Sequence, residues 1–308
     1  MKKKPWLRLL AFFLLILLSV WYMSTAFDEG LVAFRLYISE LSVLSIAIAL
    51  CLSLVMCQVK AEVNVELLGN SIEKNTHPAQ LCLAYSLAQV VRYLPGKVLG
   101  IITQSFFLTG RASSIAIWRA NVLQFLLTNA NSLPVLLLVF LGFFCGDFSY
   151  FVLPVLISIA FFYLVQCNLL ASFLENSPVF KKWSIKAAEI VSLKGVSAKK
   201  IWLYLNIEWL LYFSVFIFLL GFDSWQKAIA LSALYSSASI LAALVIIAPS
   251  GLFAREALFL WLGTLAGLEA AELLSLGVVT RVFFTLCDLL YFVSRTCISY
   301  MLKRLGYE

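Results

Sequence analysis

The sequence predicts an all-α fold, a polytopic bundle of transmembrane helices that forms a single domain over residues 1–308. Hydrophobic residues make up 63% of the chain and charged residues only 13%, and the mean hydropathy is +0.98. A soluble domain is about half apolar. The apolar residues also form runs of about twenty, the length that crosses a bilayer as a helix. A transmembrane β-barrel would instead alternate polar and apolar residues in segments of about ten.

The pattern predicts about eight membrane passages, some of them interrupted. The basic residues at positions 2–4 and the apolar run over residues 5–27 predict an uncleaved first helix, because the run is longer than that of a signal peptide. A short surface helix is expected within the polar stretch 61–75, after a passage that ends near Lys60. The expected helical segments are residues 36–59, 78–93, 98–109, 114–134, 133–145, 151–172, 201–222, 226–247, 252–267 and 269–302.

The basic residues predict the orientation in the membrane. Lysines dominate the loop at residues 175–200, and both ends of the chain are basic. Loops rich in lysine and arginine stay on the cytoplasmic side, so both termini and this loop are expected there, with Asp28 and Asp147 outside. Because the basic residues lie at segment ends, the net charge of +7 indicates contact with lipid head groups rather than with nucleic acid.

No cofactor or metal site is expected. The seven cysteines are scattered through apolar segments without a Cys-x-x-Cys spacing, and His77 is the only histidine. No P-loop, dinucleotide-binding fingerprint or nucleophile elbow is present. The candidate functional residues therefore lie outside these motif classes.

Two Pro-Gly interruptions within apolar stretches are the strongest functional signal. The first contains Pro95 and Gly96, and the second contains Pro249 and Gly251. Proline removes a backbone donor, so each position exposes polar backbone at membrane depth, where it is tolerated only inside protein or along a cavity. Paired breaks of this kind are typical of transporter binding sites. The alternative is that both are ordinary kinks or short re-entrant loops with a structural role.

Both interruptions resemble signatures of a known family. Residues 92–97 (Arg-Tyr-Leu-Pro-Gly-Lys) and 248–257 (Ala-Pro-Ser-Gly-Leu-Phe-Ala-Arg-Glu-Ala) are similar to the two motifs of the lysylphosphatidylglycerol synthase transmembrane (flippase-like) family. Ser250 and Phe253 stand where that family tends to have glycine, and Gln104 stands where it often has arginine. A glutamate usual in the following helix is also missing. The resemblance implies an integral protein of the cell inner membrane.

The resemblance implies a flippase-like transporter of an anionic phospholipid or a polyprenyl-phosphate glycolipid. Arginine and lysine near the breaks would bind phosphate. The candidate binding residues are Arg92, Pro95, Gly96, Lys97, Arg111, Arg119, Pro249, Gly251, Arg255 and Glu256. One alternative is an enzyme or an accessory subunit of lipid-linked glycan synthesis, working with a glycosyltransferase. Its acid–base group would be Glu256, Glu269, Glu272 or Asp288. Another alternative is a scaffold without transport.

Arg255 and Glu256 are expected to have separate partners. Neighbouring residues on a helix point about 100° apart, so the two side chains are not expected to pair with each other. Glu256 is predicted to form a structural ion pair with Arg281 or Arg295, and Arg255 to bind the lipid phosphate. The alternative is that both are anchors at the level of the lipid head groups.

Overall fold

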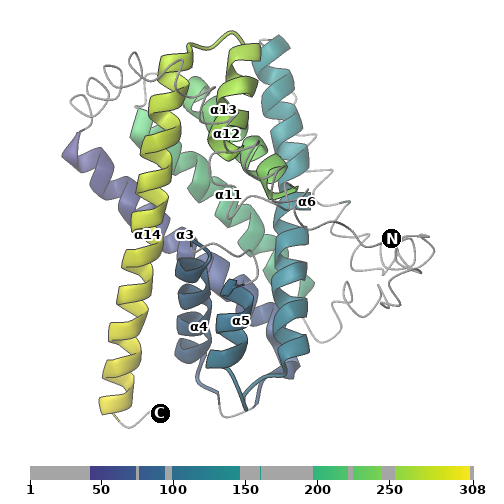
Figure 1. The fold of residues 1–308 in the computed structure, drawn as a ribbon, viewed down its shortest axis with the longest axis vertical. Helices are drawn as coiled ribbons and strands as arrows, with labels where there is room; N and C mark the ends of the chain where they lie inside the picture. The colour runs from purple at the N-terminus through teal and green to yellow at the C-terminus, as the bar shows by residue number, and fades with distance from the viewer. Residues whose placement is uncertain are drawn as a thin grey trace, which may run out of the picture. The chain divides into compact units, whose positions relative to one another are not determined.

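A computed structural model describes residues 42–73, 76–93, 99–145, 160, 197–220, 225–244 and 254–305. In these ranges the regular structure is helical, apart from one isolated antiparallel bridge between Ile72 and Ala112 (Figure 1). The predicted all-α fold is confirmed to this extent. Both Pro-Gly breaks, the expected first helix, the passage at residues 151–172 and the loop at 175–196 lie outside the described residues.

Three of the helices are long and apolar enough to cross a membrane, namely α3, α11 and α14. The shortest of them has 23 residues, about 35 Å at 1.5 Å per residue, which exceeds the hydrocarbon thickness of about 30 Å. The chain is therefore that of a helical membrane protein. The helices are α3 (Val43–Leu68), α4 (Pro78–Val91), α5 (Leu99–Phe107), α6 (Ser114–Cys145), α11 (Ala198–Leu220), α12 (Trp225–Leu244), α13 (Ala254–Leu265) and α14 (Ala270–Arg304), and a 3-10 turn follows α3 (Gly69–Ser71).

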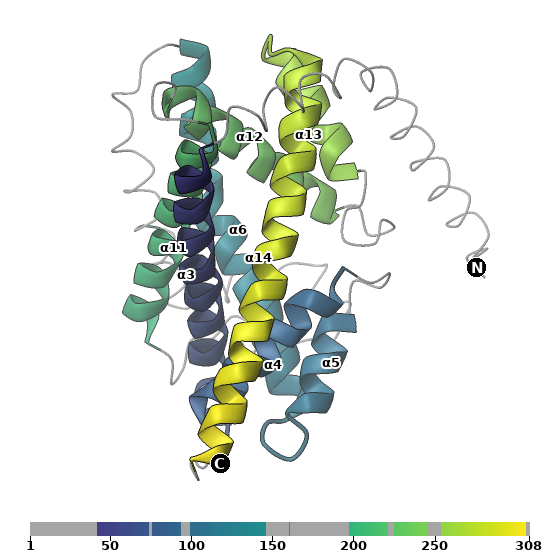
Figure 2. The same cartoon turned by 90° about the vertical axis from the view of Figure 1, so that its left-hand side faces the viewer.

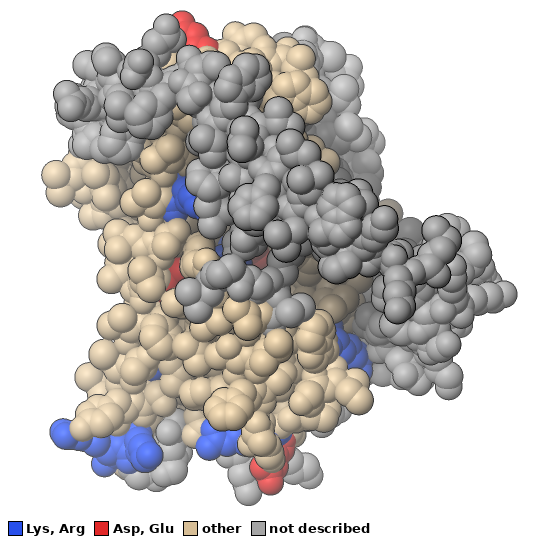
Figure 3. Space-filling model, viewed as in Figure 1, with Lys and Arg blue, Asp and Glu red and all other residues tan. Residues whose placement is uncertain are grey.

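The surface of these helices is largely apolar, as lipid contact requires. In Figure 3 most described atoms belong to uncharged residues, and blue atoms gather near the end of α14 that carries Lys303 and Arg304. Basic residues there are favourable, because they face the negative end of the helix dipole. Along α14, Val282, Leu286 and Val293 are exposed. Their spacing places them along one side of the helix, which is therefore apolar and exposed.

The expected end of the helical segment at residue 59 is wrong, because α3 continues to Leu68. Val63 and Leu67 are buried in the last two turns, and Glu66 receives a hydrogen bond from the backbone N–H of Ser197 at 3.1 Å. The charged residues of this stretch thus lie on a helix that packs against its neighbours. No separate surface helix forms at residues 61–68.

The expected boundary near Pro134 is also wrong. Helix α6 runs without interruption from Ser114 to Cys145, where the sequence suggested a polar segment followed by a new apolar one. Proline inside a helix costs one backbone hydrogen bond. Transmembrane helices tolerate that loss where neighbouring groups satisfy the released carbonyl.

The described residues fall into two compact units, and α3, α11 and α14 each contribute to both. The first unit contains α12, α13, α3 up to Ser53, α11 from Phe213, and α14 up to Cys287. Its core includes Val215, Leu219 and Phe283, with an aromatic group around Phe216. The prediction of a single domain stays a prediction.

The second unit contains α4, α5 and α6 with the remaining parts of the three shared helices. Figures 1 and 2 agree in placing α4 and α5 side by side. Its apolar core is contributed by four helices and a turn: Val63, Leu67, Leu68, Leu81, Ala84, Leu108, Ile117, Ala120, Leu123, Leu127, Ala198, Ile201 and Leu205.

Gly100 lets α4 and α5 approach closely. A Cβ at this position would lie 2.6 Å from the backbone oxygen of Ala88, which is too near for any side chain. We therefore expect Gly100→Ala to force the helices apart and to lower the free energy of unfolding by about 1–3 kcal/mol, the usual cost of overpacking. Thermal unfolding in detergent measures this.

Gly277→Ala is the matched control, because its new Cβ would meet only Phe259 at 3.5 Å, an ordinary contact. Alanine is also the better helix former by about 1 kcal/mol. Its midpoint should stay unchanged or rise. Equal loss of stability in both variants would show that the close approach at Gly100 is not the cause.

Candidate functional site

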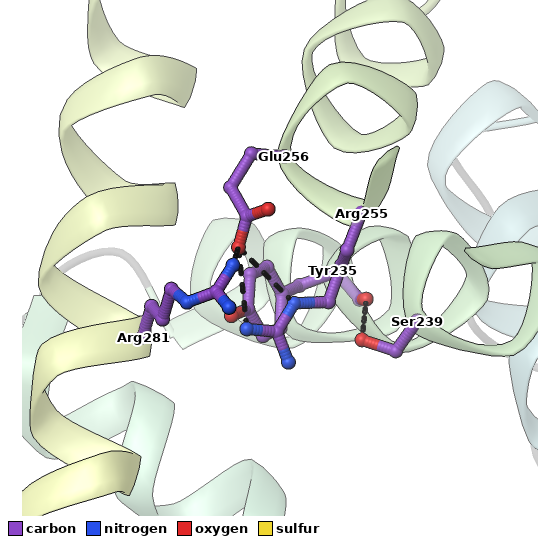
Figure 4. A network of polar contacts seen from close by, with 5 residues as sticks. All are labelled: Tyr235, Ser239, Arg255, Glu256 and Arg281. Atoms are coloured by element: carbon purple, nitrogen blue, oxygen red, sulfur yellow. Dashed lines mark hydrogen bonds and ion pairs between the residues drawn. The ribbon is translucent and has the colours of Figure 1, made fainter. Parts of the chain in front are cut away.

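Charged residues from two helices meet beside a tyrosine in the first unit. Helix α13 supplies Arg255 and Glu256, α14 supplies Arg281, and α12 supplies Tyr235 (Figure 4). We refer to these four residues as the arginine cluster. All four lie in the part of the chain assigned to the first unit.

Both guanidinium groups contact the same carboxylate oxygen. Arg281 Nη1 donates to Glu256 Oε1 at 2.6 Å, whereas Arg255 donates to it from Nε at 3.3 Å and from Nη2 at 3.2 Å. Arg281 therefore makes the shorter, stronger bond. Two guanidinium groups of the cluster thus share one carboxylate.

The cluster is largely withdrawn from solvent. The Glu256 side chain is 6% exposed, and the side chains of Arg255 and Arg281 are 23% and 22% exposed. Two buried polar atoms, Glu256 Oε2 and the Tyr235 hydroxyl, have no hydrogen-bond partner among the described residues. A buried polar atom without a partner costs about 1–3 kcal/mol, so both positions favour an additional polar group at this site.

The guanidinium group of Arg255 stacks on the ring of Tyr235. The guanidinium carbon of Arg255 lies 4.8 Å from the ring centroid, within cation–π distance. Phe259 packs edge-on against the same ring at 5.3 Å, and Phe216 lies at 6.1 Å. The hydrogen bond from Ser239 to the Tyr235 carbonyl in Figure 4 lies within α12 and does not touch the charges. The aromatic contacts restrict the Arg255 side chain.

A tight turn brings the charges on α13 and α14 together. Gly267 adopts a φ of +78°, a left-handed conformation that favours glycine, and the N–H of Leu268 donates to the Gly263 carbonyl at 3.0 Å. The chain therefore reverses after α13. Glu256 and Arg281 lie about three and four helical turns from Gly267 on either side, so an antiparallel pair of helices places them near the same level.

The expectation that Arg255 and Glu256 do not contact each other is wrong. The long side chain of Arg255 reaches Glu256 Oε1 despite the angle between adjacent residues. Of the two partners expected for Glu256, Arg281 makes the ion pair. Arg295 belongs to the second unit, where it donates to Gln58 Oε1 and stacks on Tyr291 at 5.1 Å.

The other predicted binding residues lie elsewhere. Arg92 is exposed in the turn after α4, with its guanidinium 5.5 Å from the ring of Tyr93. The carbonyl of Arg111 accepts the Glu73 N–H at 2.8 Å before α6 begins, and Arg119 is half-buried on α6. Five more lie outside the described residues: Pro95, Gly96, Lys97, Pro249 and Gly251.

The second unit contains a chain of buried amides that links α3, α4, α5 and α6. Gln104 donates to Asn64 Oδ1 at 2.8 Å, and Asn64 donates to Gln124 Oε1 at 2.9 Å. Asn121 donates to Gln104 Oε1 at 2.8 Å, and Gln124 donates to the Tyr85 hydroxyl at 3.2 Å. We refer to these five residues as the amide network. Its members satisfy one another, which is the condition for burying polar groups between helices.

The acidic residues considered for an enzyme have different surroundings. Glu269 is exposed, and Glu272 pairs with Lys227 at 2.6 Å in a partly exposed position. Asp288 accepts a weak hydrogen bond from Cys57 Sγ at 3.6 Å. Among the described residues, no three histidine, cysteine, aspartate or glutamate side chains gather in a way that suits a metal ion.

Sequence reasoning missed Tyr235 and the linkage within the amide network. An aromatic residue in an apolar helix carries no local sign that it will stack on an arginine in another helix. Gln104, Asn121 and Gln124 were visible as polar residues in apolar stretches, and that was the available signal. Their pairing with Asn64 depends on tertiary packing.

Comparisons with models of protein families, with curated proteins and with solved structures gave no match.

Proposed function

We propose that the protein is a flippase-like lipid transporter, and that the arginine cluster binds the phosphate of its lipid. The observation that carries the proposal is the convergence of Arg255 and Arg281 on a single oxygen of Glu256. Charges in a membrane protein are costly and mark ligand or ion pathways. The two guanidinium groups carry donors whose geometry matches the oxygens of a phosphodiester.

The geometry favours Arg255 as the direct phosphate ligand. Its bonds to Glu256 are 3.2–3.3 Å long, so they are more easily exchanged than the 2.6 Å bond of Arg281. Arginine presents parallel donors that match phosphate oxygens. Arg281 then holds Glu256 in place while Arg255 turns toward the lipid.

The remaining features of the proposal come from the sequence. We place the protein in the cell inner membrane with about eight passages, both termini cytoplasmic, and interrupted helices at Pro95–Gly96 and Pro249–Gly251. The resemblance to the lysylphosphatidylglycerol synthase transmembrane family supports this arrangement. An anionic phospholipid or a polyprenyl-phosphate glycolipid is the proposed substrate.

Transport by purified protein tests the proposal. In proteoliposomes that contain a labelled anionic phospholipid, wild-type protein should accelerate movement of the label between leaflets. Arg255→Lys should lose most of this acceleration, because lysine keeps the charge but not the fork of donors. Adding a glycosyl donor and its lipid acceptor should make no difference. Product formation without lipid movement would favour glycan synthesis instead.

Arg304→Lys is the matched control for the arginine substitution. Arg304 also stacks on a tyrosine, with its guanidinium 4.8 Å from the ring of Tyr300, but it is exposed at the end of α14. It should transport as the wild type does. Unchanged transport by Arg255→Lys would mean that Arg255 is an interfacial anchor.

A further inference from the structure

We propose that Glu208 is a proton-binding site, and that its protonation couples transport to a proton gradient. The coupling rests on the proposed function, whereas proton binding at Glu208 does not depend on it. The argument uses only residues of the second unit, on α3, α4, α5, α6 and the first part of α11.

Glu208 is a buried carboxylate in a helix that is long and apolar enough to cross the membrane. The residue is 7% exposed, and its Oε2 atom is buried without a hydrogen-bond partner among the described residues. A carboxylate in such a position loses hydration, and at Oε2 no contact among the described residues replaces it. Binding a proton removes this penalty, because the neutral acid is far cheaper to bury than the ion.

The charged group that faces Glu208 in the described part of the chain is Lys60 of α3. Their N–O distance is 3.7 Å, longer than a strong charge-assisted hydrogen bond. The Lys60 side chain is 31% exposed and that of Glu208 only 10%, so the cation is the less buried member of the pair. Protonation of Glu208 therefore releases Lys60 and breaks the ion pair without stranding a buried cation.

The ion pair adjoins the amide network. The Lys60 carbonyl accepts a hydrogen bond from Gln124 Nε2 at 2.9 Å, and Asn64 lies one turn further along α3. Through Asn64 the network reaches Gln104 on α5, the helix that follows the first Pro-Gly interruption. The contact between Lys60 of α3 and Glu208 of α11 is thus linked through hydrogen bonds to α5 and α6.

A second ion pair joins the same two helices and provides a matched control. Glu66 of α3 lies 3.8 Å from Lys200 of α11, almost the same distance. Its side chain is 26% exposed and that of Lys200 is 63% exposed. Glu66 also accepts the Ser197 N–H, so both of its oxygens have partners. Glu66→Gln therefore removes an ion pair between the same two helices without involving a buried oxygen that lacks a partner among the described residues.

Infrared difference spectroscopy of the full-length protein in nanodiscs tests proton binding directly. As the pH is lowered from alkaline values, the wild type should gain the carbonyl band of a buried carboxylic acid. Glu208→Gln should lose this band, and Glu66→Gln should keep it. A band that survives in Glu208→Gln, or no such band in the wild type, would overturn the proposal.

Transport under an imposed pH gradient tests the coupling. The gradient should accelerate lipid movement by the wild type and by Glu66→Gln, whereas Glu208→Gln should lose the acceleration. Gradient-driven transport by Glu208→Gln would overturn the coupling. If no variant moves lipid while the band behaves as stated, the proposed function fails and proton binding at Glu208 stands.

Discussion

Glu256→Gln should destabilise the protein by about 3–5 kcal/mol, the usual cost of removing one partner from a buried ion pair. The substitution keeps the shape of the side chain but removes the charge of the carboxylate that Arg255 and Arg281 both contact. The unfolding midpoint in detergent, followed by heat or by denaturant, reports the loss.

Glu272→Gln is the control for this variant. Its carboxylate is paired with Lys227 at 2.6 Å, as closely as Glu256 with Arg281, but 35% of its side chain is exposed. Exposed pairs contribute about 0–1 kcal/mol. A double-mutant cycle between Glu256 and Arg281 separates their coupling from misfolding, because a real pair makes the two losses non-additive. Additive losses of stability, or equal losses in Glu256→Gln and Glu272→Gln, would show that the ion pair between Glu256 and Arg281 does not stabilise the protein.

Asn64→Leu should lower the free energy of unfolding by about 1–3 kcal/mol. Asn64 is fully buried and is the residue through which Gln104 and Gln124 are joined. Leucine has a similar size but would leave Gln104 Nε2 and Gln124 Oε1 with one bond fewer each. Both atoms are in a helix bundle where water cannot replace Asn64.

Asn206→Leu provides the comparison for Asn64→Leu. Among the described residues, its amide donates to the Trp202 carbonyl of its own helix at 2.7 Å, and its side chain is half-buried. Its loss should stay under about 1 kcal/mol in the same unfolding assay. If both asparagine variants unfold at the same midpoint, the amide network does not hold the helices together.

Most of the described secondary structure could be predicted from the sequence, because helix ends carry local signals. Pro78 marks the start of α4, and Gly110, with a φ of +82°, follows the end of α5. The predicted helix boundaries were wrong where tertiary contacts keep a polar stretch of sequence helical. Glu66 looked like part of a surface segment, yet it extends α3 because its carboxylate receives the N–H of Ser197.

The candidate site was predictable only in part. Arg255 and Glu256 were recognisable as candidates because charges are rare in apolar helices, and Arg281 was one of two cations in the expected segment 269–302. Tyr235 was not predictable, because its role depends on the packing of α12 against α13. The contact between Arg255 and Glu256 was excluded by an argument about helix angles that ignores the length of the arginine side chain.

The most direct test of the account is whether the arginine cluster holds a lipid phosphate. Native mass spectrometry of protein extracted from its membrane shows which lipids remain bound. The account predicts that wild type and Arg304→Lys retain a phosphate-bearing lipid and that Arg255→Lys loses it while remaining folded. Equal retention of that lipid by folded Arg255→Lys, or no phosphate-bearing lipid on the wild type, would contradict it.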